Sequence, residues 1–198
     1  HLAIYHLSAK PIARSGGRSA VASAAYRAAV KLTNERDGLT HDFTRKRGVE
    51  HSEIVLPDGA QADWALDRSA LWNAVEYAEK RSDARVAREF EIALPHELSS
   101  GERLSLTRDF ARELANRYGA AVDFAIHQPQ GESDIRNFHA HVLMTTRTVG
   151  PDGLGEKTMI ERENKWLLNH DHPTSHMQLR DIRQAWESHA NRHLVRAG

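Results

Sequence analysis

Between Arg85 and Leu94 the side chains alternate in character, and this alternation restricts the fold more than any other stretch of the chain. Every second side chain belongs to a mainly apolar set, and the positions between these side chains include two carboxylates, Glu89 and Glu91. Because successive side chains of a strand point to opposite faces of a sheet, the stretch predicts a strand with one apolar face and one acidic face. The mainly apolar set consists of Arg88, Phe90, Ile92 and Leu94.

Hydrophobic spacing and turn residues predict further strands and helices along the chain. The order of these elements predicts an α+β fold in which helices flank a central, largely antiparallel sheet. The predicted strands are Ala3–Ser8, a hairpin of Leu39–Phe43 and Val49–Leu56, Ala121–His127 and Phe138–Thr146. The predicted helices are Arg18–Leu32, Asp67–Arg81, one that opens with the capping pair Ser99 and Glu102 and closes at Tyr118, and Ser175–Val195.

The composition is typical of one globular domain, and we expect residues 1–198 to form it. Hydrophobic residues make up 40% and charged residues 27% of the chain, and no apolar run approaches the ~20 residues that a membrane-spanning helix needs. The chain has no cysteine, which excludes disulfides, thiolate zinc sites and cysteine nucleophiles. We therefore expect any nucleophile to be an oxygen and the metal ligands to be imidazoles.

A net charge of zero, from 27 Lys and Arg against 27 Asp and Glu, hides an uneven distribution. Residues 1–50 hold 9 basic and 4 acidic side chains, whereas residues 51–100 hold 5 and 10. A basic segment of this kind is one form that an anion-facing surface takes inside a neutral protein. A chance fluctuation over a short window is the alternative, so the net charge does not exclude a nucleic-acid partner.

Two histidines, His139 and His141, lie two residues apart in a predicted strand and project from the same face. His127 ends the preceding predicted strand, and a hairpin would bring it beside the pair. Three imidazoles on one face suit a divalent metal ion with positions left open for a substrate oxygen. If Glu89 and Glu91 share that face, one of them can orient an imidazole through its free ring N–H. The alternatives are an exposed histidine pair and a solvated acidic face.

Tyr26 lies within a run of small residues in the first predicted helix, with Arg18, Arg27 and Lys31 nearby. Small neighbours let a partner approach closely, and basic neighbours suit a phosphate. A tyrosine oxygen attacks phosphorus as a covalent nucleophile when a metal polarises the phosphate and nearby cations favour the phenolate. A packed amphipathic tyrosine is the alternative. Together with the histidines, Tyr26 indicates metal-assisted transesterification of a phosphodiester.

Several sequence blocks, taken in order, resemble those of the MobA/MobL conjugative relaxases. The long segment between His127 and His139 is more similar to the Ti-plasmid transfer-protein branch than to the branch from small mobilisable plasmids. Ala140 is smaller than the bulky hydrophobe of the usual motif, although small residues occur there in this group. The blocks are Ala3–Lys10 (AIYHLSAK), Arg14–Ala20 (RSGGRSA), Ala24–Arg27 (AAYR), Glu89–Leu98 (EFEIALPHEL), His127 with Asn137–His141 (NFHAH), and Ala185–Asn191 (AWESHAN).

The resemblance implies a histidine-hydrophobe-histidine (HUH) endonuclease fold that nicks one DNA strand at a plasmid origin of transfer and later rejoins it. It implies that Tyr26 is the nucleophile and keeps the 5′ end as a phosphotyrosine. It also implies Glu89 or Glu91 as the partner of a metal ligand. The implied ligands of Mg²⁺ or Mn²⁺, with Zn²⁺ as a possible substitute in a crystal, are His127, His139 and His141. The candidates for contacts with the DNA backbone are Arg18, Arg27, Lys31, Arg45, Lys46 and Arg47.

The resemblance further implies single-stranded origin DNA, relaxosome accessory proteins and a coupling protein as partners, and the bacterial cytoplasm as the location. We expect the chain to be the N-terminal nicking part of a larger multidomain protein. Two other functions stay open. One is an HUH replication initiator, which usually presents its metal motif before its tyrosine, whereas Tyr26 precedes His139 here. The other is a non-catalytic DNA-binding module with a structural metal.

Overall fold

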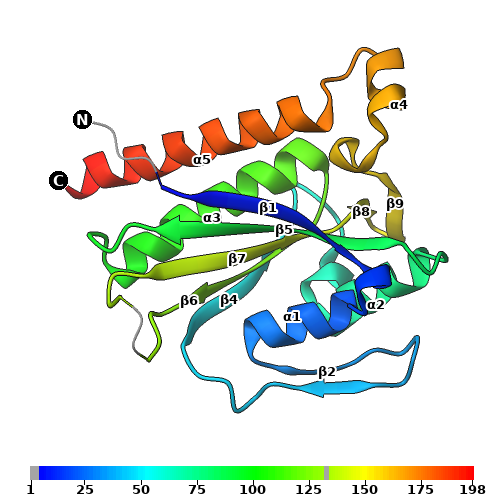
Figure 1. Ribbon diagram of the computed structural model, residues 1–198, viewed down its shortest axis with the longest axis horizontal. Coiled ribbons are helices and arrows are strands. Elements are labelled where there is room, and N and C mark those ends of the chain that lie inside the picture. Colours follow the sequence, from blue (N-terminus) through cyan, green and yellow to red (C-terminus); the bar gives the residue numbers. More distant parts are fainter. Residues whose placement is uncertain (1–4, 132–133) are drawn as a thin grey trace.

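A five-stranded antiparallel sheet forms the centre of the computed structural model, which describes residues 5–131 and 134–198 (Figure 1). The expected α+β fold around an antiparallel sheet is confirmed. From one edge of the sheet to the other, the strands are β1 (Leu7–Ala13), β5 (Arg85–Leu94), β7 (Phe138–Met144), β6 (Val122–His127) and β4 (Val49–Val55).

Helices cover both faces of this sheet. The helices α3 (Ser100–Tyr118) and α5 (Ser175–Ala197) cover one face, and α1 (Ala20–Ala28) and α2 (Arg68–Ala78) cover the other (Figure 1). Phe90 of β5 is buried in one core with Trp186 of α5, and Leu143 of β7 is buried in the other core with Trp72 of α2. The two layers follow from the alternation of β5, because Phe90 and Glu89 point to opposite faces.

Local sequence explains where α3 begins and ends. The side chain of Ser99 accepts a hydrogen bond from the backbone N–H of Glu102, and the Glu102 carboxylate accepts one from the backbone N–H of Ser99. Gly119 ends the helix with a left-handed φ of 64°, which glycine adopts without a steric penalty. The predicted helix from the capping pair to Tyr118 is therefore confirmed.

β7 lies between β5 and β6, and its register decides which side chains share a face. His141 lies opposite Glu91 of β5 and opposite Ala125 of β6. His127 lies opposite His139 across the β6–β7 pair. Residues directly opposite one another in an antiparallel pair project from the same face. The acidic face of β5 is therefore the histidine face, and it is the face that α1 and α2 cover.

The first strand lies further along the chain than the sequence predicts. The prediction covers Ala3–Ser8, of which residues 3 and 4 lie outside the described part, whereas β1 covers Leu7–Ala13. Pro11 bounds the predicted strand, but in the structure it lies inside β1, opposite Arg88. An edge strand accommodates proline because one row of its N–H groups faces no neighbouring strand.

The two strands of the predicted hairpin do not pair with each other. Instead β2 (Lys31–Thr33) pairs with β3 (Thr40–Asp42), while β4 pairs with β6. The predicted helix over residues 18–32 is also too long, because Ala29 adopts a left-handed φ of 57° and ends α1 at Ala28. Leu32 has helical spacing in the sequence, but it pairs with His41 in the β2–β3 ribbon.

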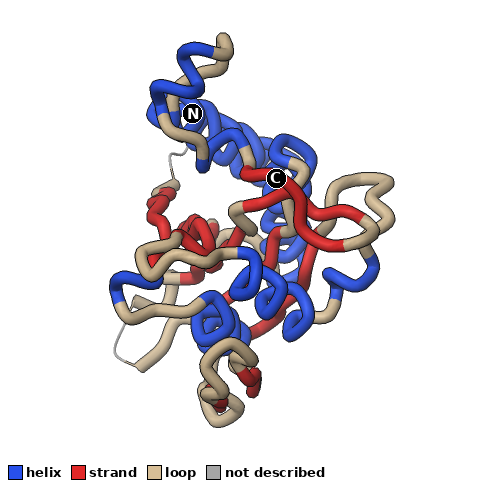
Figure 2. Tube along the Cα trace, turned by 90° about the vertical axis from the view of Figure 1, so that its right-hand side faces the viewer, coloured by secondary structure: helices blue, strands red, loops and turns tan. Residues whose placement is uncertain are grey.

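The remaining elements are short or differ little from prediction. The helix α2 ends at Ala78 instead of Arg81. Both views place the β2–β3 ribbon at one extremity of the molecule and α4 at the other (Figures 1 and 2). In the part of the chain that the structure describes, no helix combines the length and the apolar character needed to cross a membrane. The elements that the sequence does not predict are β2, β8 (Arg147–Gly150), β9 (Gly153–Lys157), α4 (Asn164–Asn169) and the 3-10 turns η1 (Arg14–Gly16), η2 (Asp63–Leu66) and η3 (Met159–Glu161).

A buried ion pair joins α2 to β6. Asp123, which is 4% exposed, accepts hydrogen bonds from Nε and Nη2 of Arg68 at 2.8 and 2.9 Å. The indole N–H of Trp72 donates to the same carboxylate at 2.9 Å. Three donors offset the loss of hydration of the carboxylate. The pair therefore holds α2 against the histidine face of the sheet.

We expect Asp123→Ala to lower the free energy of unfolding by about 3–5 kcal/mol, because the Arg68 guanidinium loses its partner in a largely buried place. Urea unfolding followed by circular dichroism measures this loss. Asp83→Ala is the control, since it removes an exposed pair with Arg81 and should cost less than about 1 kcal/mol. Equal losses in the two variants would contradict the importance of the buried pair.

Candidate active site

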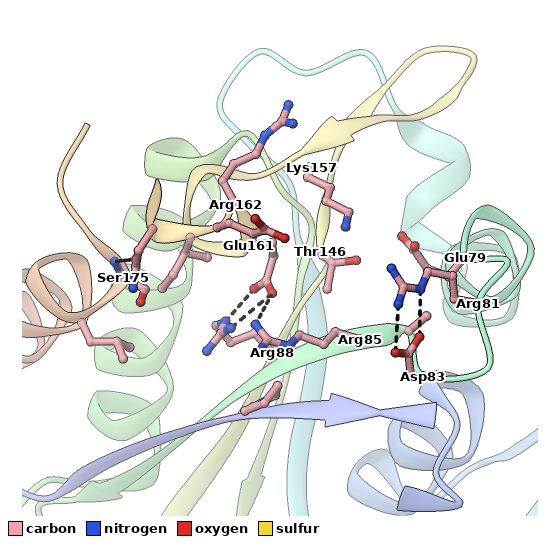
Figure 3. Close-up of a pocket in the computed structure, with 16 residues that line it drawn as sticks. Glu79, Arg81, Asp83, Arg85, Arg88, Thr146, Lys157, Glu161, Arg162 and Ser175 are labelled. Atoms are coloured by element: carbon pink, nitrogen blue, oxygen red, sulfur yellow. Dashed lines mark hydrogen bonds and ion pairs between the residues drawn. The ribbon is translucent and has the colours of Figure 1, made fainter. Parts of the chain in front are cut away.

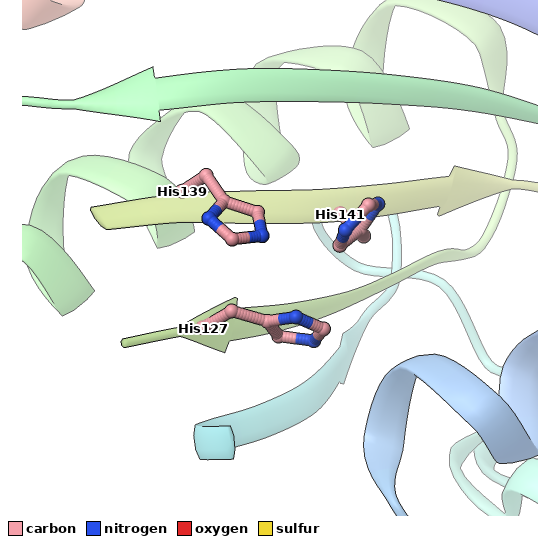
Figure 4. Close-up of side chains that lie close together, drawn as sticks. All are labelled: His127, His139 and His141. Atoms are coloured by element: carbon pink, nitrogen blue, oxygen red, sulfur yellow. The ribbon is translucent and has the colours of Figure 1, made fainter. Parts of the chain in front are cut away.

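Three histidine rings lie together on β6 and β7 (Figure 4). The centroids of the His127, His139 and His141 rings are 4.8 to 5.2 Å apart. One nitrogen of each ring lies within 4.8 Å of the nitrogens of the other two. The β6–β7 pairing that the sequence predicts therefore brings the three candidate ligands into one group.

Each ring is oriented by a hydrogen bond to a group outside the cluster. Nε2 of His127 donates to the carbonyl oxygen of Arg27 at 2.9 Å. Nδ1 of His141 donates to the carboxylate of Glu89 at 3.2 Å. Nδ1 of His139 donates to a backbone carbonyl two residues earlier at 3.4 Å. These bonds leave Nδ1 of His127 and Nε2 of the other two rings as free acceptors, which is the form of imidazole that binds a metal.

The environment of the cluster favours the neutral form of His127 and His139. Burial lowers the pKa of His127 to about 4, against the effect of its hydrogen bond to Arg27, and the neighbouring His141 and Lys46 lower it further. Burial, with the charge of His141, also lowers the pKa of His139. Metal binding requires the neutral ring. Three imidazoles with ring nitrogens within 4.8 Å of one another therefore fit a divalent cation.

Glu89 is the buried acid of the site, with a side chain that is 1% exposed. Its carboxylate accepts hydrogen bonds from Nδ1 of His141 and from Nε of Arg27, the latter at 2.5 Å, and Nζ of Lys10 lies 3.5 Å away. Burial alone raises the pKa of Glu89, but the hydrogen bonds from His141 and Arg27 hold the pKa far below its usual range. Glu89 is therefore an anion that orients His141.

Glu91 points to the same face but has a different environment. Its side chain is 45% exposed, and its nearest oxygen lies 3.9 Å from Nε2 of His141. The structure thus brings both candidate glutamates near one histidine, but it buries only Glu89 and gives only Glu89 a hydrogen bond to the ring.

Tyr26 lies in the last turn of α1 and is 46% exposed. The ring of Phe43 meets the Tyr26 ring edge-on, with 5.1 Å between centroids, and Nζ of Lys46 lies 3.9 Å from the Tyr26 centroid. The following residue, Arg27, accepts a hydrogen bond from His127 and donates one to Glu89. These two contacts dock the end of α1 that carries Tyr26 against the histidine cluster.

The cations that the sequence favours for DNA contacts have different environments. Arg27 is paired with Glu89, and Lys46 contacts Tyr26. Sequence reasoning missed the contacts of Phe43 and Lys46 with Tyr26, because no spacing pattern links a helix to a loop so far along the chain. The four candidates that are exposed are Arg18, Lys31, Arg45 and Arg47.

A separate cavity of about 570 Å³ lies near the start of β5, where Arg85 and Arg88 line it (Figure 3). Glu161 accepts a hydrogen bond from Arg88 at 2.6 Å, and Asp83 accepts one from Arg81 at 2.9 Å. Arg88 alternates with Glu89 along β5 and so points to the face opposite the histidines. The cavity is therefore not part of the histidine site.

Solved structures share this fold. One, described as "Molecular Basis of Vancomycin Resistance Transfer in Staphylococcus aureus", superposes with a TM-score of 0.80 at 31% identity and covers 99% of this chain and 95% of its own. The metal-bound structure of the conjugative relaxase TrwC in complex with oriT DNA has a TM-score of 0.56 at 12% identity, over 98% of this chain and 71% of its own. The chain therefore has the HUH fold of the conjugative relaxases.

The sequence is similar to those of bacterial mobilization proteins. The pattern that defines the MobA/MobL family matches residues 18–198. "Mobilization protein MobL" of Acidithiobacillus ferridurans is 48% identical over 180 residues, which cover 80% of this chain and 47% of that protein. "Conjugal transfer protein TraA" of Agrobacterium fabrum is 35% identical over 215 residues, which cover 100% of this chain and 19% of that protein. The chain belongs to the MobA/MobL family, and it spans less than half the length of these two relatives.

Glu89→Gln is expected to weaken the binding of Mn²⁺ about 10- to 100-fold, because His141 loses the anionic partner that orients it. Calorimetric titration of the metal-free protein with Mn²⁺ measures the affinity. Glu91→Gln is the matched control, since it neutralises an exposed carboxylate on the same strand face, and it should weaken binding by less than about threefold. A larger effect of Glu91→Gln would assign the supporting role to Glu91.

Proposed function

We propose that this chain nicks and rejoins one strand of DNA at a plasmid origin of transfer through a covalent phosphotyrosine at Tyr26. The observation that carries the proposal is the hydrogen bond from His127 to the carbonyl of Arg27, which docks the Tyr26 end of α1 against the three histidines. An exposed phenol beside a metal-binding group is what transfer of a phosphodiester to tyrosine requires. The names of the relatives and the oriT DNA bound to TrwC support the same substrate class.

The proposed reaction is a transesterification. The hydroxyl oxygen of Tyr26 forms a bond to the scissile phosphorus while the bond from phosphorus to the 3′ oxygen breaks. The phenol gives up a proton and the 3′ oxygen takes one up, so the products are a 5′-phosphotyrosine and a free 3′-hydroxyl. The number of phosphoester bonds is unchanged. The reverse reaction can therefore rejoin the strand without ATP.

We assign His127, His139 and His141 as the ligands of a divalent ion, Mg²⁺ or Mn²⁺. When bound, the ion neutralises charge on the non-bridging oxygens of the phosphate. The chain itself holds the free ring nitrogens in place, since Glu89 orients His141 and the Arg27 carbonyl orients His127. We assign Glu89, instead of Glu91, as the residue that supports a ligand.

The exposed cations near Tyr26 are proposed to hold the DNA backbone. Arg18 precedes α1, Lys31 follows it, and Arg45 and Arg47 flank Lys46 in the loop that contacts Tyr26. Contacts with phosphates position a strand without reading its sequence. These side chains therefore support binding of single-stranded DNA across the end of α1, whereas Arg27 is engaged with Glu89.

We further propose that the chain is the N-terminal nicking domain of a longer protein, because the relatives extend far beyond the region that it matches. Its proposed partners are single-stranded origin DNA, relaxosome accessory proteins and a coupling protein. The bacterial cytoplasm is the proposed location, since plasmid DNA is nicked there.

Tyr26→Phe is expected to abolish the covalent adduct with DNA, because the variant lacks the attacking oxygen. The test is incubation with Mn²⁺ and an end-labelled single-stranded oligonucleotide that carries the origin of transfer of the encoding plasmid, followed by denaturing electrophoresis. Tyr77→Phe is the matched control, since Tyr77 is an exposed tyrosine on α2, and it should form as much adduct as the wild type. No adduct with wild type would favour the non-catalytic DNA-binding module, whereas an equal amount with Tyr26→Phe would show that Tyr26 is not the nucleophile.

His141→Ala is expected to reduce nicking at least about 100-fold while circular dichroism shows an unchanged fold, because a metal ligand is lost. Single-turnover nicking of the same oligonucleotide measures the effect. His176→Ala changes an exposed histidine of α5 and should nick at the wild-type rate. Unchanged nicking by His141→Ala would remove His141 from the site.

A further inference from the structure

Lys46 makes two contacts with Tyr26. Its Nζ lies 3.9 Å from the centroid of the Tyr26 ring and donates a hydrogen bond to the Tyr26 carbonyl at 3.0 Å. A cation over the face of an aromatic ring is attracted by the negative potential of that face. One ammonium group therefore binds both the ring and the backbone of the proposed nucleophile.

The same loop provides a second contact with the ring. Phe43 meets Tyr26 edge-on at 5.1 Å, and the backbone N–H of Lys46 donates to the carbonyl of Phe43 at 2.9 Å, which closes a turn over residues 43–46. The backbone N–H of Phe43 in turn donates to the carbonyl of Val30, just beyond α1, at 3.1 Å. The turn is thus tied to α1 and places an aromatic edge and a cation on one tyrosine ring.

The charge of Lys46 is not balanced by an acid. Among the described residues no carboxylate lies within 4.0 Å of its Nζ, in contrast to Lys10, which pairs with Glu89. Lys46 is half-buried, and burial together with the charge of Arg27 lowers its pKa. A partly buried cation with cationic neighbours is stabilised when an anion joins it.

Lys46 is connected to the histidine cluster through the end of α1. Its Nζ binds the carbonyl oxygen of Tyr26 at 3.0 Å, and the carbonyl oxygen of the next residue, Arg27, accepts the hydrogen bond of His127 at 2.9 Å. The ammonium of Lys46 and the ring of His127 therefore bind adjacent carbonyl groups of α1. An anion that reaches the Tyr26 ring meets the charge of Lys46 on that ring.

We propose that Lys46 is a positioning residue for Tyr26, holding the ring for attack and compensating the negative charge that develops between the phenol oxygen and the phosphate during transfer. This inference rests on the proposed function of Tyr26. It assigns Lys46 a role in the chemical step, which differs from a general contact with the DNA backbone. A backbone contact would change the affinity for DNA, whereas a positioning residue changes the rate once DNA is bound.

A purely structural role is the competing explanation. Helices end with carbonyls that lack partners within the helix, and a lysine that binds one of them stabilises the helix end. Such a role needs the hydrogen-bond donor of Lys46 and its favourable placement at the helix end, but not a charge acting on the reaction. The experiment must therefore remove the charge and keep the donor.

The absence of cysteine makes that experiment possible, because Lys46→Cys introduces a single thiol. Alkylation with 2-bromoethylamine gives a side chain that carries an ammonium group, and alkylation with iodoacetamide gives a neutral amide of similar reach that still donates a hydrogen bond. We expect the neutral form to nick about 10- to 100-fold more slowly under single-turnover conditions with saturating DNA. The aminoethyl form should recover to within about threefold of wild type.

Lys165→Gln is the control for the loss of one positive charge, since Lys165 is an exposed lysine of α4, outside the proposed site. It should leave both DNA binding, measured by fluorescence anisotropy, and the saturated single-turnover rate unchanged. Lys46→Gln and Lys46→Arg repeat the comparison if the cysteine variant does not give the wild-type circular dichroism spectrum.

Two outcomes would overturn the inference while leaving the proposed function intact. Equal rates for the two alkylated forms would show that Lys46 acts only as a helix cap. Weaker DNA binding with an unchanged saturated rate would show that it is only a backbone contact. A wild-type protein that forms no adduct would overturn the proposed function and this inference together.

Discussion

The buried carboxylate of Glu89 is the group on which the arrangement of the site depends. It is 1% exposed and yet charged, because Arg27 donates to it from α1 and His141 donates to it from β7. A carboxylate at this depth without partners would be strongly unfavourable. The three groups therefore hold one another in place. A single acid fixes both the orientation of a candidate metal ligand and the helix that carries Tyr26.

Two carbonyl groups in the last turn of α1 accept hydrogen bonds from other segments, and these bonds hold the end of the helix in place. The Tyr26 carbonyl accepts a hydrogen bond from Lys46, and the Arg27 carbonyl accepts one from His127. Ala29 stops the helix there by adopting a left-handed conformation, which costs an alanine roughly 1–2 kcal/mol. The carbonyl groups at the end of α1 therefore also help to build the site, because Lys46 and His127 bind them. The proposed transfer to DNA uses a tyrosine whose backbone is held by these contacts and which is 46% exposed.

Local signals explain which elements could be predicted. The alternation of β5 and the capping pair of α3 are encoded within a few residues, and the spacing of His139 and His141 required only that they lie in a strand. The pairing of β4 with β6 is different, because it joins segments that many residues separate. The segment just before β4 offered a plausible local hairpin with it, and only the tertiary structure shows that this segment, β3, pairs with β2 instead.

The sequence by itself determined the chemistry that is available: three histidines that one strand pair could bring together, two acidic side chains on one strand face, a tyrosine with basic neighbours, and no thiol. It also determined the family, because the motifs occur in order along the chain. Tertiary structure decided which glutamate is buried against His141, that Arg27 is engaged with that acid, and that Lys46 lies on the Tyr26 ring. These outcomes depend on desolvation and on contacts between segments far apart in the chain. The spacing of residues within a short segment predicts neither of them.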